Sequence, residues 1–221
     1  IHLSQPAITL AIAELEKFTG LQLFERTTNG MVPTSCGAQL AQRAQFLQQQ
    51  LEKGVLDASA VTPATDRHAS AHRLASAVSP SSLRALAAVA LWPSETLAAQ
   101  HLGLTQPAVH RALKSLEHLA GMTLMQKSPR GTRLTQAGEA LLRRVKLAIA
   151  EASAMEADIA HWHGHMRGRI VIGALPLSVT MILPKVLSQL FATQPAVEVT
   201  VIDGTYESLL QKLLYADVDV I

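Results

Sequence analysis

Several features of membrane, disulfide-bonded or disordered proteins are scarce in this sequence. Only 16% of the 221 residues are charged and 48% are hydrophobic, and such a composition is too apolar for a mainly disordered chain. The apolar stretch 170–183 contains a glycine and a proline and is shorter than the roughly 20 residues that a spanning helix needs. Cys36 is the only cysteine, which excludes an intrachain disulfide and suits the reducing cytoplasm.

Motifs of several enzyme classes are missing as well. The sequence has no G-x-S-x-G, no Walker or dinucleotide-binding fingerprint and no H-E-x-x-H, so we expect it not to be an enzyme and to use no cofactor. It opens Ile-His-Leu without a methionine or a charged-then-apolar leader. We therefore expect no export signal, and we expect the natural protein to continue beyond both ends.

One stretch of the sequence occurs twice. A shift of 101 residues superimposes 3–43, the first copy, on 104–144, the second copy, without a gap, and 14 of the 41 pairs are identical. A repeat of this length is too long for a solenoid and indicates a duplicated domain. We expect two helices, 83–90 and 96–102, to precede the second copy, whereas the sequence holds no counterpart of them before the first.

Each copy carries the signals of a helix. Ser4 and Thr105 can cap a helix through a side-chain oxygen, and Pro6 and Pro107 follow where a missing N–H costs nothing. Apolar residues then recur at helical spacing, which predicts one inward-facing side. They are Ile8, Ala11, Ile12, Leu15 and Phe18 in the first copy, and Val109, Ala112, Leu113, Leu116 and Leu119 in the second.

The opposite side of the second-copy helix is polar and basic. Gln106 and Arg111 are suited to bidentate pairing with adenine and guanine edges, and His110 and Lys114 can reach phosphates or bases. A basic turn at 127–133 predicts a small hairpin, or wing. A short helix, a turn at 103, a longer helix and a wing are typical of a winged helix-turn-helix.

The repeated motifs resemble a known family. Leu-Ser-Gln-Pro-Ala-Ile from residue 3 and Leu-Thr-Gln-Pro-Ala-Val from residue 104, each followed by Leu-Glu and Gly, closely resemble LysR-type transcriptional regulators, as does Arg-Gly-Thr-Arg-Leu-Thr-Gln-Ala-Gly-Glu-Ala-Leu at 130–141. The resemblance implies a bacterial-type, sequence-specific regulator that binds double-stranded DNA, responds to a small-molecule inducer and forms a dimer or tetramer. The DNA-binding candidates are Thr105, Gln106, Pro107, His110, Arg111, Lys114, Lys127, Arg130 and Arg133, with Ser4, Gln5, Pro6 and Thr9 in the first copy.

The two copies differ in charge. Residues 111–146 contain eight basic and two acidic residues, a net charge of +6, whereas the matching window 10–45 contains three of each. Phosphate neutralisation supplies much of the affinity for DNA, so we expect the second copy to bind far better. Leu10 replaces Arg111 in the first copy, which leaves open that the first copy serves dimerisation or protein contact instead.

A long helix follows the second copy. Apolar residues between 136 and 162 alternate in steps of four and three, which is a heptad seam. They are Leu141, Val145, Ala148, Ala152, Met155, Ile159 and Trp162. The resemblance implies that this helix dimerises with a second chain, and the alternative is a helix packed within its own monomer. The first copy has a shorter counterpart, 39–52, which we expect to stop at Gly54, followed by a flexible linker, 55–82, with a loose helix at 69–78.

Three histidines near the end of this helix, His161, His163 and His165, raise the possibility of a metal site. No cysteine or carboxylate lies nearby, and Gly164 and Gly168 indicate a helix end. We favour a hinge and expect no metal.

The last segment predicts the order strand, helix, strand, helix, strand over 169–174, 183–191, 197–202, 206–214 and 218–221, and hence a parallel α/β sheet. It resembles the first lobe of the LysR-type effector domain, which is similar to periplasmic binding proteins. The resemblance makes Ser178, then Thr205, the candidates for binding an inducer, unless Ser178 only caps a helix. We expect little inducer binding by this chain alone.

The expected architecture is therefore multidomain. Two winged helix-turn-helix domains, 1–54 and 83–135, are joined by the linker 55–82, and a linker helix, 136–166, leads to the incomplete effector lobe, 167–221. The leading function is DNA-binding transcription regulation. The alternative is a structural protein whose winged helices mediate assembly with weak, nonspecific DNA contact, and a specificity ratio near one would favour it.

Overall fold

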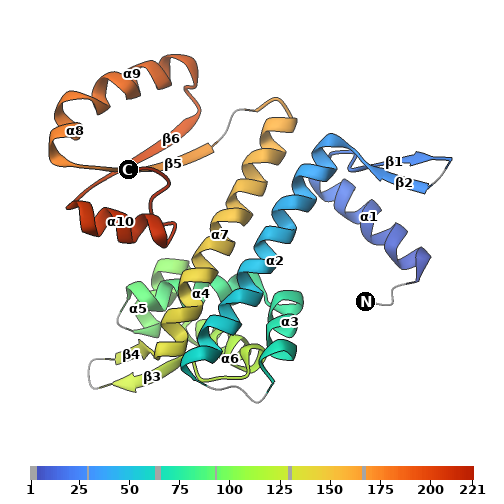
Figure 1. The fold of residues 1–221 in the computed structure, drawn as a ribbon, viewed down its shortest axis with the longest axis horizontal. Coiled ribbons are helices and arrows are strands. Elements are labelled where there is room, and N and C mark those ends of the chain that lie inside the picture. The colour runs from blue at the N-terminus through green and yellow to red at the C-terminus, as the bar shows by residue number, and fades with distance from the viewer. Residues whose placement is uncertain (1–3, 29, 63–65, 93, 129–130, 166–167) are drawn as a thin grey trace.

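The computed structural model describes residues 4–28, 30–62, 66–92, 94–128, 131–165 and 168–221. Within these ranges the chain is mostly helical, with three two-stranded sheets. Two long helices, α2 (Ser35–Val61) and α7 (Gln136–Trp162), lie side by side and run in opposite directions (Figure 1). A helical body surrounds one end of this pair, and an α/β layer follows the other end of α7.

The first copy forms α1 (Gln5–Thr19), an antiparallel hairpin of β1 (Phe24–Thr27) and β2 (Gly30–Pro33), and then α2. The second copy forms α6 (Gln106–Ala120), an antiparallel hairpin of β3 (Met125–Ser128) and β4 (Gly131–Leu134), and then α7. The expected preceding helices are present as α4 (Pro80–Leu91) and α5 (Glu95–Leu102). Gly103 ends α5 in the left-handed conformation, at φ 65°, which glycine adopts without steric cost.

The same hydrogen bonds shape both copies. Oε1 of Glu16 accepts from the backbone N–H groups of Leu23 and Phe24, at 2.8 and 3.0 Å. Oε1 of Glu117 accepts from those of Leu124 and Met125, at 2.9 and 3.2 Å. These residues are related by the 101-residue shift, so one glutamate in each copy ties the helix to the strand that follows it.

The main core lies where α2, α3 (Arg67–Ala77), α4, α6 and α7 meet. Its fully buried side chains include Leu51, Val55, Leu74, Leu86, Val109, Leu113, Leu116, Leu124, Leu141 and Val145. The first copy has a separate, small cluster of only three buried residues, Leu23, Cys36 and Leu40, among the described residues. The two copies therefore differ in how much apolar surface their folding buries.

The expectation that α2 stops at Gly54 and that a flexible linker follows is wrong, although the helix expected at 69–78 is present as α3. The helix continues to Val61, because the missing side chain of Gly54 lets α2 approach α7: a Cβ there would lie 2.7 Å from Cδ1 of Leu141. Asp66 caps α3 by accepting from the N–H of Ala69 at 3.1 Å. Residues 63–65 of the expected linker lie outside the described residues.

The expected inward-facing side of the first-copy helix is largely exposed. Phe18 is 85% exposed, Leu15 48% and Ile8 45%, whereas Leu116 and Val109, which match Leu15 and Ile8 in the second copy, are fully buried. The difference arises because α4 and α5 pack on α6, while the described residues supply no such helices to α1. The apolar face is therefore buried, as expected, only in the second copy.

The expected side-chain caps at Ser4 and Thr105 are also wrong. Both residues occupy the N-cap position in extended conformation, yet neither side chain makes a capping hydrogen bond. In the second copy the carbonyl oxygen of Thr105 accepts from the N–H groups of Ala108 and Val109, at 3.0 and 3.1 Å. Since proline at the second helical position has no N–H, backbone acceptors satisfy the next free donors.

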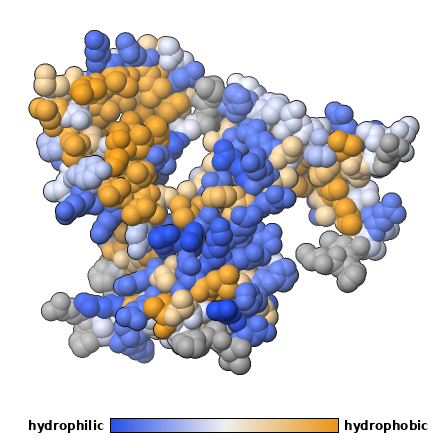
Figure 2. All heavy atoms as spheres, viewed as in Figure 1, coloured by the Kyte–Doolittle hydropathy of each residue, from blue (hydrophilic) through white to orange (hydrophobic). Residues whose placement is uncertain are grey.

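The α/β layer has the expected order. Strands β5 (Gly168–Ala174) and β6 (Val197–Asp203) pair in parallel, and a bridge from Ile172 to Val220 marks the expected third strand. Helices α9 (Leu183–Thr193) and α10 (Tyr206–Leu214) are present, with an additional short helix, α8 (Pro176–Met181), that the sequence did not predict. Figure 2 shows hydrophobic residues gathered on this layer.

No single helix among the described residues is long and apolar enough to cross a membrane. Helices α3 and α4 pass that test only together, across a bend of 107°. Both helices contribute buried residues to the main core. Core helices with a similar apolar composition pass the same test.

Candidate nucleic-acid interface

Helix α6 separates a buried side from a polar one. Val109, Leu113 and Leu116 are buried against the core, while the predicted contact residues are all exposed. These are Thr105, Gln106, Pro107, His110, Arg111 and Lys114. The helix therefore presents a continuous row of polar and basic side chains from its N-terminus, the arrangement that base reading requires.

A glutamate that the sequence analysis missed organises this row. Oε2 of Glu95, in the first turn of α5, accepts a hydrogen bond from Nε2 of Gln106 at 2.7 Å and lies 3.1 Å from Nδ1 of His110. Glu95 is the better buried partner, with its side chain 18% exposed against 50% for His110. It therefore holds two predicted base-reading side chains in place, and nothing in the local sequence pattern reveals this contact.

Lys114 is already paired within the helix. Its Nζ donates to Oε2 of Glu117 at 2.8 Å, and this hydrogen bond raises the pKa of the Lys114 ammonium group. The ammonium group stands one turn along α6 from the exposed Arg111. Lys114 and Arg111 are the two basic side chains on this side of α6, and Glu117 offsets the charge of Lys114.

The wing carries the other basic side chains. Lys127 and Arg133 are exposed, but the strand register places Lys127 opposite Thr132 and Arg133 opposite Gln126. Directly opposed residues share one face of a hairpin and neighbours alternate, so Lys127 and Arg133 point to opposite faces. Arg130, the third predicted wing contact, lies outside the described residues.

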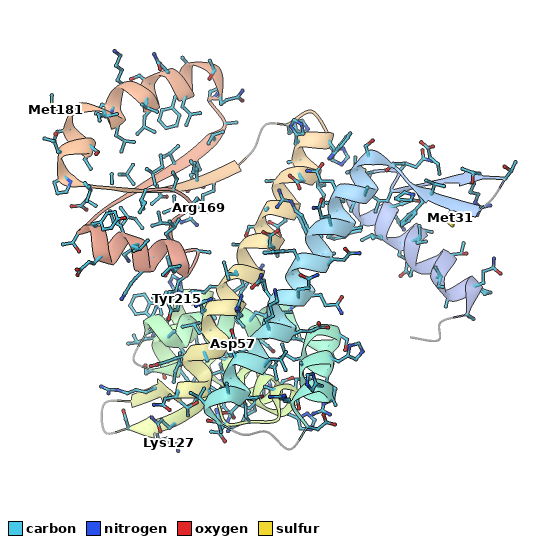
Figure 3. The ribbon with its side chains drawn as sticks, viewed as in Figure 1. Met31, Asp57, Lys127, Arg169, Met181 and Tyr215 are labelled. Carbon is cyan, nitrogen blue, oxygen red and sulfur yellow. The ribbon has the colours of Figure 1, made fainter. Side chains whose placement is uncertain are left out.

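At two positions where the second copy is basic, the corresponding surface of the first copy is apolar. Leu10 is 62% exposed and Val32 is 49% exposed, and they occupy the positions of Arg111 and Arg133. Ser4, Gln5, Pro6 and Thr9 are exposed as predicted. Thr9 donates its hydroxyl to the carbonyl oxygen of Gln5 at 3.0 Å, within α1. Figure 3 shows Met31 on this hairpin and Lys127 on the other, near opposite ends of the α2–α7 pair.

The predicted dimerisation seam of α7 faces α2 of the same chain. Leu141, Val145 and Ala148 are completely buried, and Ala152, Met155 and Ile159 are half-buried. Trp162 is 43% exposed and donates from Nε1 to Oε1 of Gln39 at 3.2 Å. Toward the start of α2 and the end of α7, hydrogen bonding to Asp158 raises the pKa of Arg43. In this structure the seam therefore packs within the monomer, as the alternative expects, and the role of α7 in dimerisation stays a prediction.

The histidines at the end of α7 have a structural contact. Nε2 of His163 donates to the carbonyl oxygen of Thr19 at 2.7 Å, which ties the end of α7 to the end of α1. Among the described residues, no group of three or more histidine, cysteine or acidic side chains is placed to hold a metal ion.

The two candidate inducer contacts differ in their surroundings. Thr205 is the N-cap of α10, and its Oγ1 accepts from the N–H of Ser208 at 3.3 Å. Ser178 is not a helix cap, because Leu175 occupies the N-cap of α8; the capping alternative for Ser178 is therefore wrong. A shallow hollow between α8 and β6 is lined by Pro176, Val179, Val201 and Asp203. Neither Ser178 nor Thr205 is among these lining residues.

The geometry of α4, α5, α6 and the β3–β4 wing defines a winged helix-turn-helix protein. A sequence profile described as "Bacterial regulatory helix-turn-helix protein, lysR family" matches residues 1–38 and 80–139, one stretch in each copy. The HTH-type transcriptional regulator GalR of Pseudomonas putida is 34% identical over 217 residues, which cover 98% of this chain and 52% of GalR. A probable hydrogen peroxide-inducible genes activator of Mycobacterium xenopi is 33% identical over 59% of this chain and 69% of that protein.

This chain belongs to the LysR family of bacterial regulatory helix-turn-helix proteins. Its similar proteins are named as regulators and activators, not as enzymes. Among solved structures, a peroxide-bound mutant of Corynebacterium glutamicum OxyR matches 64% of this chain and 44% of its own, with 27% identity and a TM-score of 0.44. The chain spans about half the length of curated relatives such as GalR.

Proposed function

We propose that this chain is the DNA-binding part of a cytoplasmic transcriptional regulator that recognises a specific duplex sequence and whose activity responds to a small-molecule inducer. The observation that carries the proposal is the exposed row of Gln106, His110 and Arg111 on α6. The carboxylate of Glu95 contacts the first two of these side chains. A rigid helix that presents amide, imidazole and guanidinium groups outward suits the donor and acceptor pattern of the major groove.

We further propose that the two winged segments are copies of one domain and that the second copy is the principal reader. Both have the same order of helix, hairpin and long helix, and the same glutamate bonds to the hairpin. They differ at the surface, where Arg111 and Arg133 of the second copy correspond to the exposed Leu10 and Val32 of the first. Counterion release from phosphates therefore favours the second copy.

The inducer site is proposed at the carboxyl ends of β5 and β6, where ligands bind in open α/β sheets. Ser178 remains the better candidate contact, because its hydroxyl does not cap α8, whereas the Oγ1 of Thr205 is engaged by the N–H of Ser208. The family relationship supports ligand response and homo-oligomerisation as properties of the intact regulator.

Affinity measured against salt tests the DNA-binding proposal. Duplexes that the chain binds are first selected from a randomised pool. The affinity for each selected duplex is then compared with the affinity for its scrambled sequence. Arg111→Ala should cost about 1 to 3 kcal/mol on the selected duplex and reduce its preference over the scrambled one. Lys185→Ala is the matched control, since it removes one exposed positive charge from α9, in the separate α/β layer. Equal affinity of the wild-type chain for both duplexes would refute sequence-specific reading and favour the assembly alternative.

A further inference from the structure

The contacts between α2 and α7 repeat themselves. Arg144 donates from Nε to Oδ2 of Asp57 at 2.9 Å and from Nη1 to Oε1 of Gln50 at 3.0 Å. Arg43 makes the matching pair, to Asp158 and, at 3.2 Å, to Glu151. Arg43 and Arg144, Asp57 and Asp158, and Gln50 and Glu151 are each related by the 101-residue shift.

Such reciprocal contacts define an approximate two-fold axis. When residue i of one copy contacts residue j of the other, and j of the first also contacts i of the second, the interface is isologous. Two identical chains produce that relationship in a symmetric dimer. Here both halves of the interface belong to one chain, and the axis passes between α2 and α7.

The interface is well filled. Leu51, Val55 and Ala58 of α2 are at most 1% exposed, and the seam residues of α7 that face the same core are buried completely. Gly54 lies in this tightly packed part, because a Cβ there would also come within 3.0 Å of Cβ of Arg144. A second chain could reach this surface of α7 only by displacing α2.

The two-fold relationship also places the two winged segments. Because α2 and α7 run in opposite directions, the β1–β2 hairpin precedes α2 at one end of the pair and the β3–β4 hairpin precedes α7 at the other (Figures 1 and 3). One chain therefore carries two copies of the helix-and-wing unit in the reciprocal placement that dimeric regulators need to meet two half-sites.

We propose that this chain is a self-contained pseudo-dimer, in which α2 and α7 pair within one chain in place of the linker helices of two chains, so that a single chain spans both halves of one DNA site. The spanning part rests on the proposed DNA-binding function. The site is read unequally, because the matched windows of the two copies carry net charges of +6 and zero. Any further association of chains then uses a surface other than the α2–α7 seam.

A charge-swap experiment distinguishes pairing within a chain from pairing between chains. Arg144 and Asp57 are the pair to exchange, because the other partner of Arg144, Gln50, is neutral. Arg144→Asp and Asp57→Arg should each lower the Tm by about 2 to 6 °C, a range typical of modest destabilisation in a chain of this size. The double variant should recover at least half of that loss. A mixture of the two single variants, unfolded and refolded together, should recover none.

Recovery in the mixture, with particles of twice 23.7 kDa, would overturn the proposal, because complementary charges would then meet between chains. Light scattering on the unmodified chain and on the swap variants adds the particle mass to this comparison. A mass of 23.7 kDa across the concentration range supports the proposal, and a dimer that the double swap leaves intact but the single swaps dissociate contradicts it.

The stoichiometry on DNA tests the spanning part. One chain should saturate one selected duplex containing both half-sites, and the footprint should cover both. Two chains per duplex would refute the spanning part. A monomer with recovery only in the double variant, but without any sequence preference, would refute the proposed DNA reading while leaving the intrachain pairing established, so the two failures are distinguishable.

Discussion

The carboxylate of Glu95, on α5, accepts a hydrogen bond from Nε2 of Gln106, on α6, at 2.7 Å. This bond joins the two helices of the helix-turn-helix and fixes the amide plane of a predicted base-reading side chain. Among the described residues, one N–H and the carbonyl oxygen of that amide have no other partner, which is what a bidentate contact with adenine needs. Orientation before binding lowers the entropic cost of the contact.

We predict that Glu95→Ala reduces sequence preference without reducing total DNA affinity. Loss of orientation should lower the ratio of selected to scrambled affinity about three- to tenfold, while loss of a negative charge near the phosphates strengthens nonspecific binding. Competition binding at fixed salt measures both. Glu95→Gln is the control, because it removes the charge but keeps an oxygen acceptor for Gln106. A specificity loss as large in Glu95→Gln as in Glu95→Ala would show that charge, not orientation, matters.

The matched positions Arg111 and Leu10 allow a reciprocal test of the two copies. Leu10→Ala should change DNA affinity by less than about 0.5 kcal/mol, whereas Leu10→Arg should strengthen binding and steepen the dependence on salt by about one unit of slope. Titrations between low and physiological salt give both quantities. If Leu10→Ala costs as much as Arg111→Ala, the first copy reads DNA through apolar contact, and the charge argument for the second copy fails.

Replacing Gly54 by alanine should have two opposite effects on stability, one from helix propensity and one from a steric contact with α7. Alanine gains about 1 kcal/mol over glycine inside a helix, but its Cβ would lie 2.7 Å from Cδ1 of the fully buried Leu141. Separation of two packed helices costs about 1 to 3 kcal/mol, so Gly54→Ala should be destabilising by about 1 kcal/mol in urea unfolding. Gln49→Ala, at an exposed position of the same helix, should stay within about 0.5 kcal/mol. A stabilised Gly54→Ala would mean that α2 and α7 are less closely packed.

Much of the fold was predictable because its signals are local. The hairpin at 125–134, the long helix beginning at Gln136 and the order of the α/β layer follow from turn residues, caps and hydrophobic periodicity. The heptad seam of α7 was equally clear, but periodicity shows that a face is buried and does not reveal which helix covers it. The sequence therefore predicted the seam and could not identify α2 as its partner.

Other features depend on contacts between distant residues. Gly54 looked like a helix end, because a glycine lowers helix propensity in the same way whether it ends a helix or admits a neighbour. The bond from Gln106 to Glu95 spans eleven positions and two helices, so no local pattern indicates it. The exposure of the polar side of α6 was predictable from the helical spacing, and its role in recognition stays a prediction. The opposite faces of Lys127 and Arg133 required the strand register.

The equivalent glutamates Glu117 and Glu16 make the same bonds in unequal surroundings, which predicts unequal stability effects. Glu117→Ala leaves the N–H groups of Leu124 and Met125 without their acceptor beside the main core, and should cost about 2 to 4 kcal/mol. Glu16→Ala should cost less than half of that, because the first copy rests on a cluster of three buried residues in the described part of the chain. Hydrogen exchange of the two hairpins, together with urea unfolding, measures both losses. Glu117→Gln, which keeps an oxygen acceptor, should recover about half the loss. Equal losses in the two copies would show that the first copy is as firmly packed as the second.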